Sequence, residues 1–294
     1  MSSRWLALPA FAKINLSLEL VGRRPDGYWE LRTVYQSLTL HDRLRMRLRR
    51  RSGIEVRVPG GGAPAGRGNL VHRLLTRAVR ALGLRRGVEV EIEKLIPAGR
   101  GLGGGSSDAA AALAGLLRLT RTRAPEEELL RLAAGAGMDV PFFLVGGRAL
   151  GVGRGEDVYA LDDGAPATCL LVCPPFPIAT RAAYAWAAGL TLGRRAAIIA
   201  DSPEGRAGAG NDFEPAVFSR FPELGRMKSA LLGAGASQAG LSGSGSTVYA
   251  LFSHRAAAER ACVAGWARAA SVFLAETLPR AGYRRALRWG VVQR

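Results

Sequence analysis

The residues best suited to chemistry form a glycine-rich stretch in the first half of the chain. Five glycines lie within the seven positions from Gly99 to Gly105, and Ser106 and Ser107 follow directly. Residues that lack a Cβ let the backbone approach a bulky anion, and the N–H groups of a following helix N-terminus point toward it. The composition therefore predicts a loop that holds a polyphosphate. A tight glycine turn without a ligand is the alternative interpretation.

Two familiar nucleotide-binding motifs do not fit this stretch. A P-loop ends in Gly-Lys-Ser/Thr, whereas Gly105 is followed by two serines. The dinucleotide fingerprint G-x-G-x-x-G is formally present as Gly99, Gly101 and Gly104, but it needs an acidic residue after a second strand about 20 residues later. Residues 119–125 read Leu-Thr-Arg-Thr-Arg-Ala-Pro instead. We therefore reject both motifs.

A strand and a helix are expected to position this loop. Residues 88–93 alternate apolar and acidic side chains, which predicts the strand that enters the loop. The alanine- and leucine-rich run 109–119 predicts the helix that leaves it. Ser106 or Ser107 is expected to cap that helix, with Asp108 in its first turn.

Two further polar positions stand out by their context. Lys13 is one of only three lysines among 41 basic residues, and it lies on the polar face of a predicted strand over residues 4–20. That face also carries Asn15, and an ordinary exposed sheet face would explain the same alternation. Asp139 is an isolated acid just before Val-Pro, where an aspartate is also typical of a turn.

The rest of the chain predicts a two-domain α+β protein. Asn69 is expected to cap a helix that ends near residue 81. A change in composition at 161–166 predicts a boundary between domains 1–163 and 164–294. Beyond it, a β-α-α-β-β-α-β order predicts an antiparallel sheet with helices on one face. The elements expected there are strands over 168–173, near 246–252 and over 270–277, helices over 180–184, 223–232 and 256–268, and a hairpin through 241–246.

The formal net charge is +17, and nearly all basic residues are arginines. Such a charge attracts nucleotides, nucleic acids or acidic surfaces. Residues 44–50 alternate apolar residues with arginine, which predicts a strand with a basic outer face. Because no aromatic residues are interleaved for base stacking, we interpret this face as solvated surface rather than as an RNA-binding strand.

The three cysteines, Cys169, Cys173 and Cys262, lie in apolar runs without metal-ligand spacing. They are typical of reduced core residues in a cytoplasmic protein. The N-terminal apolar stretch is broken by Pro9 and does not read as a signal peptide. No run of 18 apolar residues is present, so no membrane span is expected.

Three motifs stand in an order that is known from one superfamily. They are Pro-Ala-Phe-Ala-Lys-Ile-Asn at 9–15, Pro-x3-Gly-Leu-Gly-Gly-Gly-Ser-Ser at 97–107 and Leu-Ser-Gly-Ser-Gly-Ser at 241–246. On these motifs the chain resembles the GHMP small-molecule kinases. It is most similar to the branch that acts on a cytidine-diphosphate-linked methylerythritol in the non-mevalonate isoprenoid pathway. The motifs that carry this closer likeness are Arg-Pro-Asp-Gly-Tyr at 24–28, Asp-Val-Pro-Phe-Phe at 139–143 and Asn-Asp-Phe-Glu at 211–214.

The resemblance implies a ribosomal S5-like N-terminal domain and a ferredoxin-like C-terminal domain. It implies phosphoryl transfer from ATP, with Mg²⁺ carried by the nucleotide, to one hydroxyl of a small-molecule substrate linked to cytidine diphosphate. It assigns Lys13 and Asp139 as the catalytic pair. A carboxylate beside an ammonium would stay ionised and could accept the hydroxyl proton as the new bond forms. We expect a monomer or a weak homodimer.

The resemblance also implies the binding residues. Those expected around ATP are Asn69, Pro97, Ala98, Gly99, Arg100, Gly101, Leu102, Gly103, Gly104, Gly105, Ser106 and Ser107. Those expected around the substrate are Asn15, Tyr28, Trp29, Thr180, Tyr184, Gly243, Ser244 and Gly245. In this family the cytosine ring lies between two aromatic side chains, at the positions of Tyr28 and Tyr184.

One position departs from the family pattern. The family has a histidine after Asp-Gly-Tyr/Phe, where its ring hydrogen-bonds the cytosine edge, but this chain has Trp29. An indole offers one donor and no acceptor, so it cannot take both roles of an imidazole. Our hypothesis is that backbone groups near Trp29 read the base and that the cytidine-linked substrate is still preferred.

Two other functions remain open. The chain could be a GHMP kinase for another small alcohol, such as homoserine or a mevalonate, although the Asp139 motif and the Tyr28 turn argue against it. It could also be a nucleic-acid-binding protein of S5-like fold, given its charge. ADP release with different acceptors distinguishes the first, and salt-dependent RNA binding without ATP turnover would indicate the second.

Overall fold

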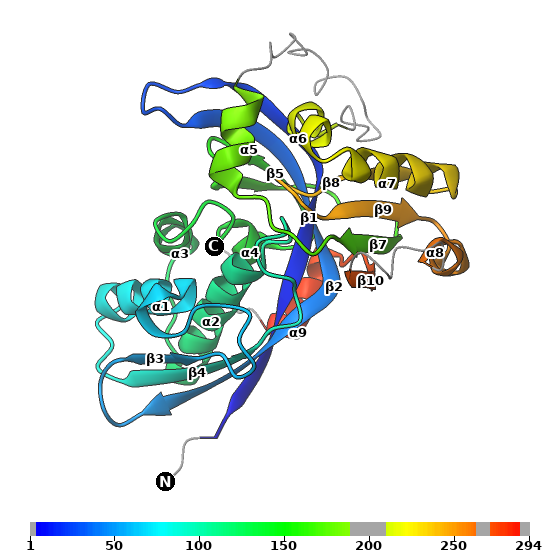
Figure 1. Ribbon diagram of the computed structural model, residues 1–294. Coiled ribbons are helices and arrows are strands. Elements are labelled where there is room, and N and C mark those ends of the chain that lie inside the picture. Colours follow the sequence, from blue (N-terminus) through cyan, green and yellow to red (C-terminus); the bar gives the residue numbers. More distant parts are fainter. Residues whose placement is uncertain (1–3, 189–209, 263–270, 289–294) are drawn as a thin grey trace.

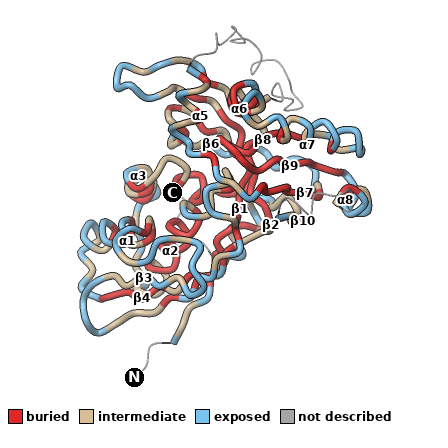
Figure 2. The backbone as a smooth tube through the Cα atoms, viewed as in Figure 1, coloured by how far each residue is buried: buried red, intermediate tan, exposed pale blue. Residues whose placement is uncertain are grey.

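The computed structural model describes residues 4–188, 210–262 and 271–288 (Figure 1). Two long strands, β1 (Leu6–Arg23) and β2 (Trp29–Arg49), pair antiparallel along nearly their whole length and run through the middle of the molecule. The predicted first strand is therefore confirmed. The arginine-rich strand expected over residues 44–50 is the last part of β2, which is continuous from Trp29 to Arg49. Figure 2 shows buried segments along the central part of this pair.

The first sheet has the order β3-β4-β2-β5-β6, with β1 paired to β2. Its other strands are β3 (Ile54–Arg57), β4 (Gly87–Glu93), β5 (Arg148–Val152) and β6 (Asp157–Ala160). The helices of this half are α1 (Leu70–Ala81), α2 (Gly104–Thr120), α3 (Glu126–Ala134) and the short α4 (Phe142–Val145). Apolar side chains of α1 and α2, such as Leu74 and Leu113, pack on Val90 and Ile92 of β4 in one core. The Asn69 cap of α1 is confirmed, since its Oδ1 accepts from Val71 N at 2.9 Å.

The arginine-rich part of β2 is largely ion-paired. Across the β2–β4 ladder, Arg47 contacts Glu89 at 2.7 Å, and Glu89 is buried. The other pairs are Arg43 with Glu93, Arg45 with Glu91 and Arg49 with Glu55. Neutralised arginines attract a polyanion less than free ones, so this strand gives little support to the nucleic-acid alternative.

The second sheet has the order β10-β7-β9-β8, with all neighbours antiparallel, as predicted. Its strands are β7 (Thr168–Cys173), β8 (Gln238–Leu241), β9 (Val248–Phe252) and β10 (Ser271–Glu276). Leu170 and Phe252 point into the core beneath the helices, whereas Leu171 packs with Ile14 of β1 and Leu38 of β2. The long strand pair therefore covers the face of this sheet that the helices leave open.

The helices of the second half are α5 (Thr180–Ala187), α6 (Glu214–Arg220), α7 (Pro222–Gly233) and α8 (Arg255–Cys262). The sequence predicted α5, α7 and α8 but not α6, which starts directly after Phe213. The expected continuation of α8 to residue 268 lies outside the described residues. None of the described helices is long and apolar enough to span a bilayer.

The last described helix, α9 (Arg280–Leu287), returns to the first core. Its Tyr283 is buried and donates a hydrogen bond to the carbonyl of Phe143 at 2.6 Å. The strands of the two sheets separate between residues 160 and 168, but α9 packs on the half that precedes this point. The division at 163/164 stays a prediction.

Candidate active site

Lys13 and Asp139 come from opposite ends of the first half and lie side by side. Lys13 is in β1, Asp139 is in the turn between α3 and α4, and Nζ is 3.4 Å from Oδ2. Only 3% of the lysine side chain is exposed, against 35% of the aspartate side chain. The carboxylate therefore faces open space while the ammonium supports it from beneath. An irregularity in the β1–β2 register between Phe11 and Lys13 accompanies this inward orientation.

A chain of hydrogen bonds fixes the ammonium of Lys13. Its Nζ donates to Asn15 Oδ1 at 2.7 Å, and Asn15 Nδ2 donates to Thr33 Oγ1 at 2.7 Å. Thr33 in turn donates to the carbonyl of Ser17 at 2.6 Å. Asn15 uses its side-chain oxygen and one amide proton in these hydrogen bonds, so both ends of its amide group are fixed. At Lys13 and Asn15 the polar face of β1 is therefore a buried network and not a solvated surface, whereas Glu19 further along is 28% exposed.

Asp139 is held by a second hydroxyl. Tyr35 of β2 donates to Asp139 Oδ1 at 3.1 Å. Burial, together with the charge of Asp139, raises the pKa of Tyr35 well above its usual value, so the phenol keeps its proton and acts as a donor. The two oxygens of the carboxylate thus have different partners, the phenol at Oδ1 and the ammonium at Oδ2.

The glycine loop leads into α2, but the helix begins earlier than predicted. The N-cap is Gly103 with φ +71°, and no side chain caps the helix, so the expectation for Ser106 or Ser107 is wrong. A glycine in the left-handed region can end the loop there, which a residue with a Cβ rarely does. Asp108 consequently lies beyond the first turn, where it is buried beside Lys94.

The loop packs directly against the lysine. The backbone N–H of Lys13 donates to the carbonyl of Leu102 at 3.1 Å. A Cβ at Gly103 would lie 3.0 Å from Lys13 Cγ and 2.7 Å from Phe143 Cζ, so only glycine fits. Eleven residues, 97–107, were expected to hold phosphate. Of these, Gly101 alone lines the cavity described below.

The loop between β8 and β9 meets the glycine loop from the other half of the chain. Ser242 Oγ donates to the carbonyl of Gly101 at 2.9 Å. Asn211 Nδ2 donates to the carbonyls of Leu241 and Gly243 at 2.8 and 2.7 Å. Glu214 Oε1 accepts from Leu241 N at 2.9 Å. The Asn-Asp-Phe-Glu segment therefore anchors this loop, a role that its sequence did not reveal.

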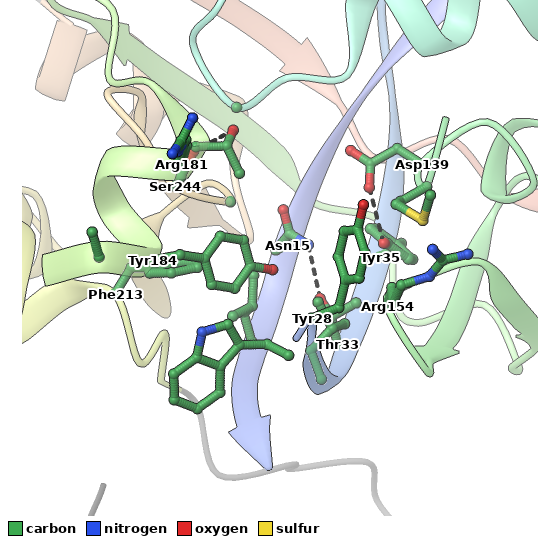
Figure 3. A pocket seen from close by; sticks show the side chains of 18 of the residues that line it. Asn15, Tyr28, Thr33, Tyr35, Asp139, Arg154, Arg181, Tyr184, Phe213 and Ser244 are labelled. Carbon is green, nitrogen blue, oxygen red and sulfur yellow. Dashed lines mark hydrogen bonds between the residues drawn. The ribbon is translucent and has the colours of Figure 1, made fainter. Parts of the chain in front are cut away.

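These elements enclose a cavity of about 830 Å³ (Figure 3). Tyr184, Arg181 and Ser244 lie on one side of β1, and Tyr35, Asp139 and Arg154 lie on the other. The expected site residues that line it are Lys13, Asn15, Tyr28, Trp29, Gly101, Asp139, Thr180, Tyr184, Gly243 and Ser244. Asn69, Gly245 and the rest of the glycine loop are not part of its lining.

Sequence reasoning missed several residues of this lining. Thr33 and Tyr35 lie within β2 and carry no local signal that separates them from ordinary strand residues. Arg154 follows β5, and its guanidinium is recognisable as part of the cavity only after β5 has paired with β2. The others are Leu18, Arg23, Gly27, Leu31, Met138, Arg181, Ala185 and Phe213. The basic members make the cavity attractive to phosphate groups.

The aromatic side chains occupy two sides of the cavity mouth. The rings of Trp29 and Tyr184 are nearly parallel, with centroids 6.5 Å apart and 19° between their planes. Tyr184 also meets Phe213 edge to face at 4.9 Å. Burial and the charge of Asp139 raise the pKa of Tyr184 to about 12. Trp29 and Tyr184 therefore form one aromatic side of the cavity mouth.

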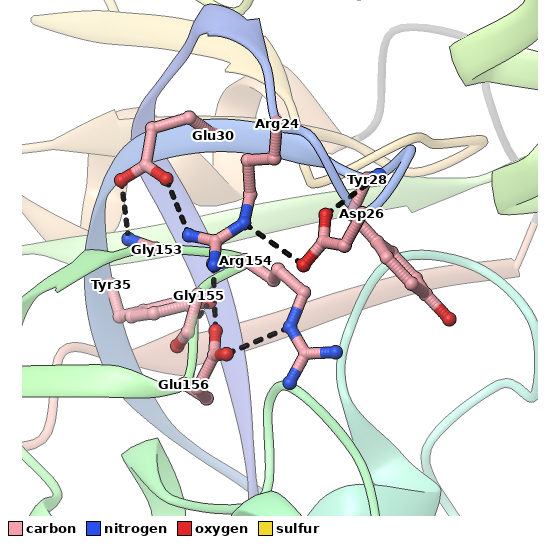
Figure 4. A network of polar contacts seen from close by, with 9 residues as sticks. All are labelled: Arg24, Asp26, Tyr28, Glu30, Tyr35, Gly153, Arg154, Gly155 and Glu156. Atoms are coloured by element: carbon pink, nitrogen blue, oxygen red, sulfur yellow. Dashed lines mark hydrogen bonds and ion pairs between the residues drawn. The ribbon is translucent and has the colours of Figure 1, made fainter.

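The turn between β1 and β2 is fixed to the turn between β5 and β6 (Figure 4). Arg24 contacts Glu30 at 2.7 Å, and Glu30 Oε1 accepts from the N–H of Gly153 at 3.2 Å. The guanidinium of Arg154 lies 5.1 Å from the ring centre of Tyr28. Tyr28 is thus held at the opposite side of the mouth from Tyr184, more than half exposed.

The chain carries both domains of the GHMP kinases. Residues 69–147 match the GHMP kinases N terminal domain and residues 192–266 match the GHMP kinases C terminal family. A 4-diphosphocytidyl-2-C-methyl-D-erythritol kinase from Pelotomaculum thermopropionicum is 42% identical over 82% of this chain and 87% of its own. The chain belongs to this family of kinases.

Further relatives support that assignment. The 4-diphosphocytidyl-2-C-methyl-D-erythritol kinase of Geobacter sp. (strain M21) is 39% identical over 90% of this chain and 98% of its own. A crystal structure of 4-(cytidine 5'-diphospho)-2C-methyl-D-erythritol kinase has a TM-score of 0.76 and 33% identity, covering 92% of this chain and 98% of that one. A homoserine kinase from Cytophaga hutchinsonii has a TM-score of 0.66 at 21% identity, and it shares the fold.

Proposed function

We propose that this protein phosphorylates a hydroxyl of 4-diphosphocytidyl-2-C-methyl-D-erythritol with ATP, giving the 2-phosphate and ADP in non-mevalonate isoprenoid precursor biosynthesis. The observation that carries the proposal is the 3.4 Å contact between Lys13 and Asp139 in a cavity bordered by the glycine loop. The identity of the substrate is inferred from the kinases to which this chain is similar.

Asp139 acts as the acceptor of the hydroxyl proton. Its carboxylate is exposed to the cavity while Tyr35 and Lys13 hold its two oxygens in place. Phosphoryl transfer requires mainly positioning and neutralisation of charge. The ammonium of Lys13 orients the carboxylate and stabilises charge that develops between the acceptor oxygen and the transferred group.

The ATP phosphates occupy the loop 97–107 at the start of α2. Three glycines there, Gly99, Gly101 and Gly103, have φ between +68° and +79°, a backbone that other residues rarely adopt. Ser107, in the first turn of α2, has a buried hydroxyl with no hydrogen-bond partner among the described residues. Mg²⁺ bound with the nucleotide would neutralise charge on the phosphates.

The cytidine diphosphate part occupies the mouth of the cavity. Tyr184 and Trp29 lie on one side and Tyr28 on the other, which suits stacking on a base. Arg23 and Arg181 add positive charge for the diphosphate. We also propose that the protein is cytoplasmic and is a monomer or a weak homodimer.

A panel of acceptors tests this function. ADP release is measured with the diphosphocytidyl substrate, homoserine and mevalonate, each at saturating ATP. We expect turnover with the first substrate and at most background with the other two. Turnover with homoserine or mevalonate alone would replace the proposal with the other kinase activity, and no turnover with any of them would overturn it.

A further inference from the structure

A buried cluster of three charged residues lies directly behind the glycine loop. Lys94, which follows β4, contacts Asp108 of α2 at 2.7 Å and also contacts Asp42 of β2. The exposed fractions of these side chains are 8%, 2% and 0%. The three residues do not line the cavity that holds Lys13 and Asp139. Burying charges is costly even when they are paired, and here two carboxylates share a single ammonium.

The cluster contacts the chain on both sides of the loop. Before the loop, Asp42 Oδ1 accepts from the backbone N–H groups of Leu95 and Ile96 at 2.6 and 2.8 Å. After the loop, Asp108 anchors α2 through Lys94, and a Cβ at Gly104 would lie 3.2 Å from Lys94 Nζ. One ammonium therefore joins the strand that enters the loop to the helix that leaves it.

Asp108 is not fully satisfied in this arrangement. Its Oδ1 is buried without a hydrogen-bond partner among the described residues, as is Ser107 Oγ next to it. An unpaired oxygen in the interior is expensive and is rarely kept for packing alone. Its presence in the second turn of α2 indicates that the cluster is retained for its effect on the loop.

We infer that Asp42, Lys94 and Asp108 are positioning residues, a clamp that sets the distance between the two ends of the phosphate loop and thereby the affinity for ATP. This inference rests on the proposed function of residues 97–107. The clamp acts through backbone geometry, because none of the three side chains lines the substrate cavity. Its loss should therefore affect ATP and leave the binding of the diphosphocytidyl substrate nearly unchanged.

Steady-state kinetics of Asp108→Asn and Lys94→Met test the clamp. Asp108→Asn keeps the shape of the side chain and removes its charge, whereas Lys94→Met removes the shared ammonium. We expect KM for ATP to rise roughly ten- to a hundredfold, since small misplacements of a binding group have effects of this size. KM for the diphosphocytidyl substrate should stay within about twofold of the parent value.

Arg47→Met is the matched control. It removes a paired cation from the same strand as Asp42, and Glu89 keeps its second partner Arg57. We expect KM for ATP to remain at the parent value even where the melting temperature falls. If Lys94→Met does not fold, the Kd of ADP for Asp108→Asn, measured by calorimetry, decides the question.

The outcomes separate this inference from the proposed function. An ATP KM and an ADP Kd within twofold of the parent, in folded Asp108→Asn, would overturn the clamp while the kinase activity stands. An equal rise in KM for both substrates would also overturn it, because it would indicate general loosening. Failure of the parent itself to release ADP would overturn the proposed function instead.

Discussion

The carbonyl of Gly101 accepts a hydrogen bond from Ser242 Oγ at 2.9 Å. This contact joins the glycine loop of the first half to the β8–β9 loop of the second. A Cβ at Gly101 would lie 2.0 Å from the carbonyl oxygen of Ser242, and its φ is +79°. The two glycine-rich motifs, far apart in sequence, are thus packed as one wall of the site.

Substitution Gly101→Ala should therefore disrupt this wall. We expect a loss of about 2–4 kcal/mol in the free energy of unfolding, from the strained backbone and the clash together. Urea denaturation measures it. Gly105→Ala is the control, since Gly105 lies in α2 with nothing within 4 Å of its added Cβ. That variant should be as stable as the parent or up to about 1 kcal/mol more stable. Equal effects of the two variants would contradict the account.

Tyr35→Phe should impair the chemical step. It removes the hydroxyl that donates to Asp139 Oδ1, and a hydrogen bond to a charged group contributes about 1.5–3 kcal/mol. We expect kcat to fall at least about tenfold. Tyr283→Phe is the control, because its hydroxyl donates to the carbonyl of Phe143 away from the cavity. A kcat for Tyr35→Phe equal to that of Tyr283→Phe would show that the hydroxyl does not support the carboxylate.

Trp29→His tests how the base is read. If backbone groups read the cytosine, as we expect, the variant should change the ratio of kcat/KM between cytidine- and uridine-diphosphate substrates by less than about tenfold, the value of one neutral hydrogen bond. The ratio is measured with both substrates for both proteins. Comparable turnover of the uridine analogue by the parent would refute the hypothesis.

The pH dependence of stability should report on Asp108. Burial raises the pKa of Asp108 from 3.8 to about 7. Between these values the folded protein binds the proton more tightly than the unfolded chain does, so the stability contributed by this group is lost as the pH rises from about 4 to about 7. Asp108→Asn stays neutral, and its free energy of unfolding should increase relative to that of the parent over this interval. A difference that does not vary with pH would contradict this assignment.

Local patterns predicted those features that depend on neighbouring residues alone. The Asn69 cap, the strand before the glycine loop and the hairpin through 241–246 each follow from a short stretch of sequence. The α+β class and the antiparallel second sheet followed from the order of such elements, whereas the two domain types were expected from the resemblance to the kinases. The predicted start of α2 was wrong. Serine is a favourable N-cap, but Gly103 can adopt a left-handed backbone, so the loop ends and the helix begins before the serines.

The parts that were not predicted depend on register and on long-range packing. Tyr35 meets Asp139 only after β2 has paired with β1 and α4 has packed on the sheet. The ion pairs of the arginine-rich part of β2 depend on which glutamate of β4 lies opposite each arginine. A shift of one residue in the β2–β4 register would change these partners, and the sequence alone does not determine that register. The Lys94 cluster draws on three separate elements and carries no motif.

The carboxylate of Asp139 is central to the account, and Asp139→Asn tests it most directly. The variant keeps the shape of the side chain and its contact with Tyr35 but cannot accept a proton as a carboxylate does. ADP release with the diphosphocytidyl substrate is compared with that of the parent at saturating ATP. We predict that kcat falls by roughly 10²–10⁴-fold with an unchanged melting curve, as expected for loss of a general base. Activity within a few-fold of the parent would contradict the role assigned to this residue.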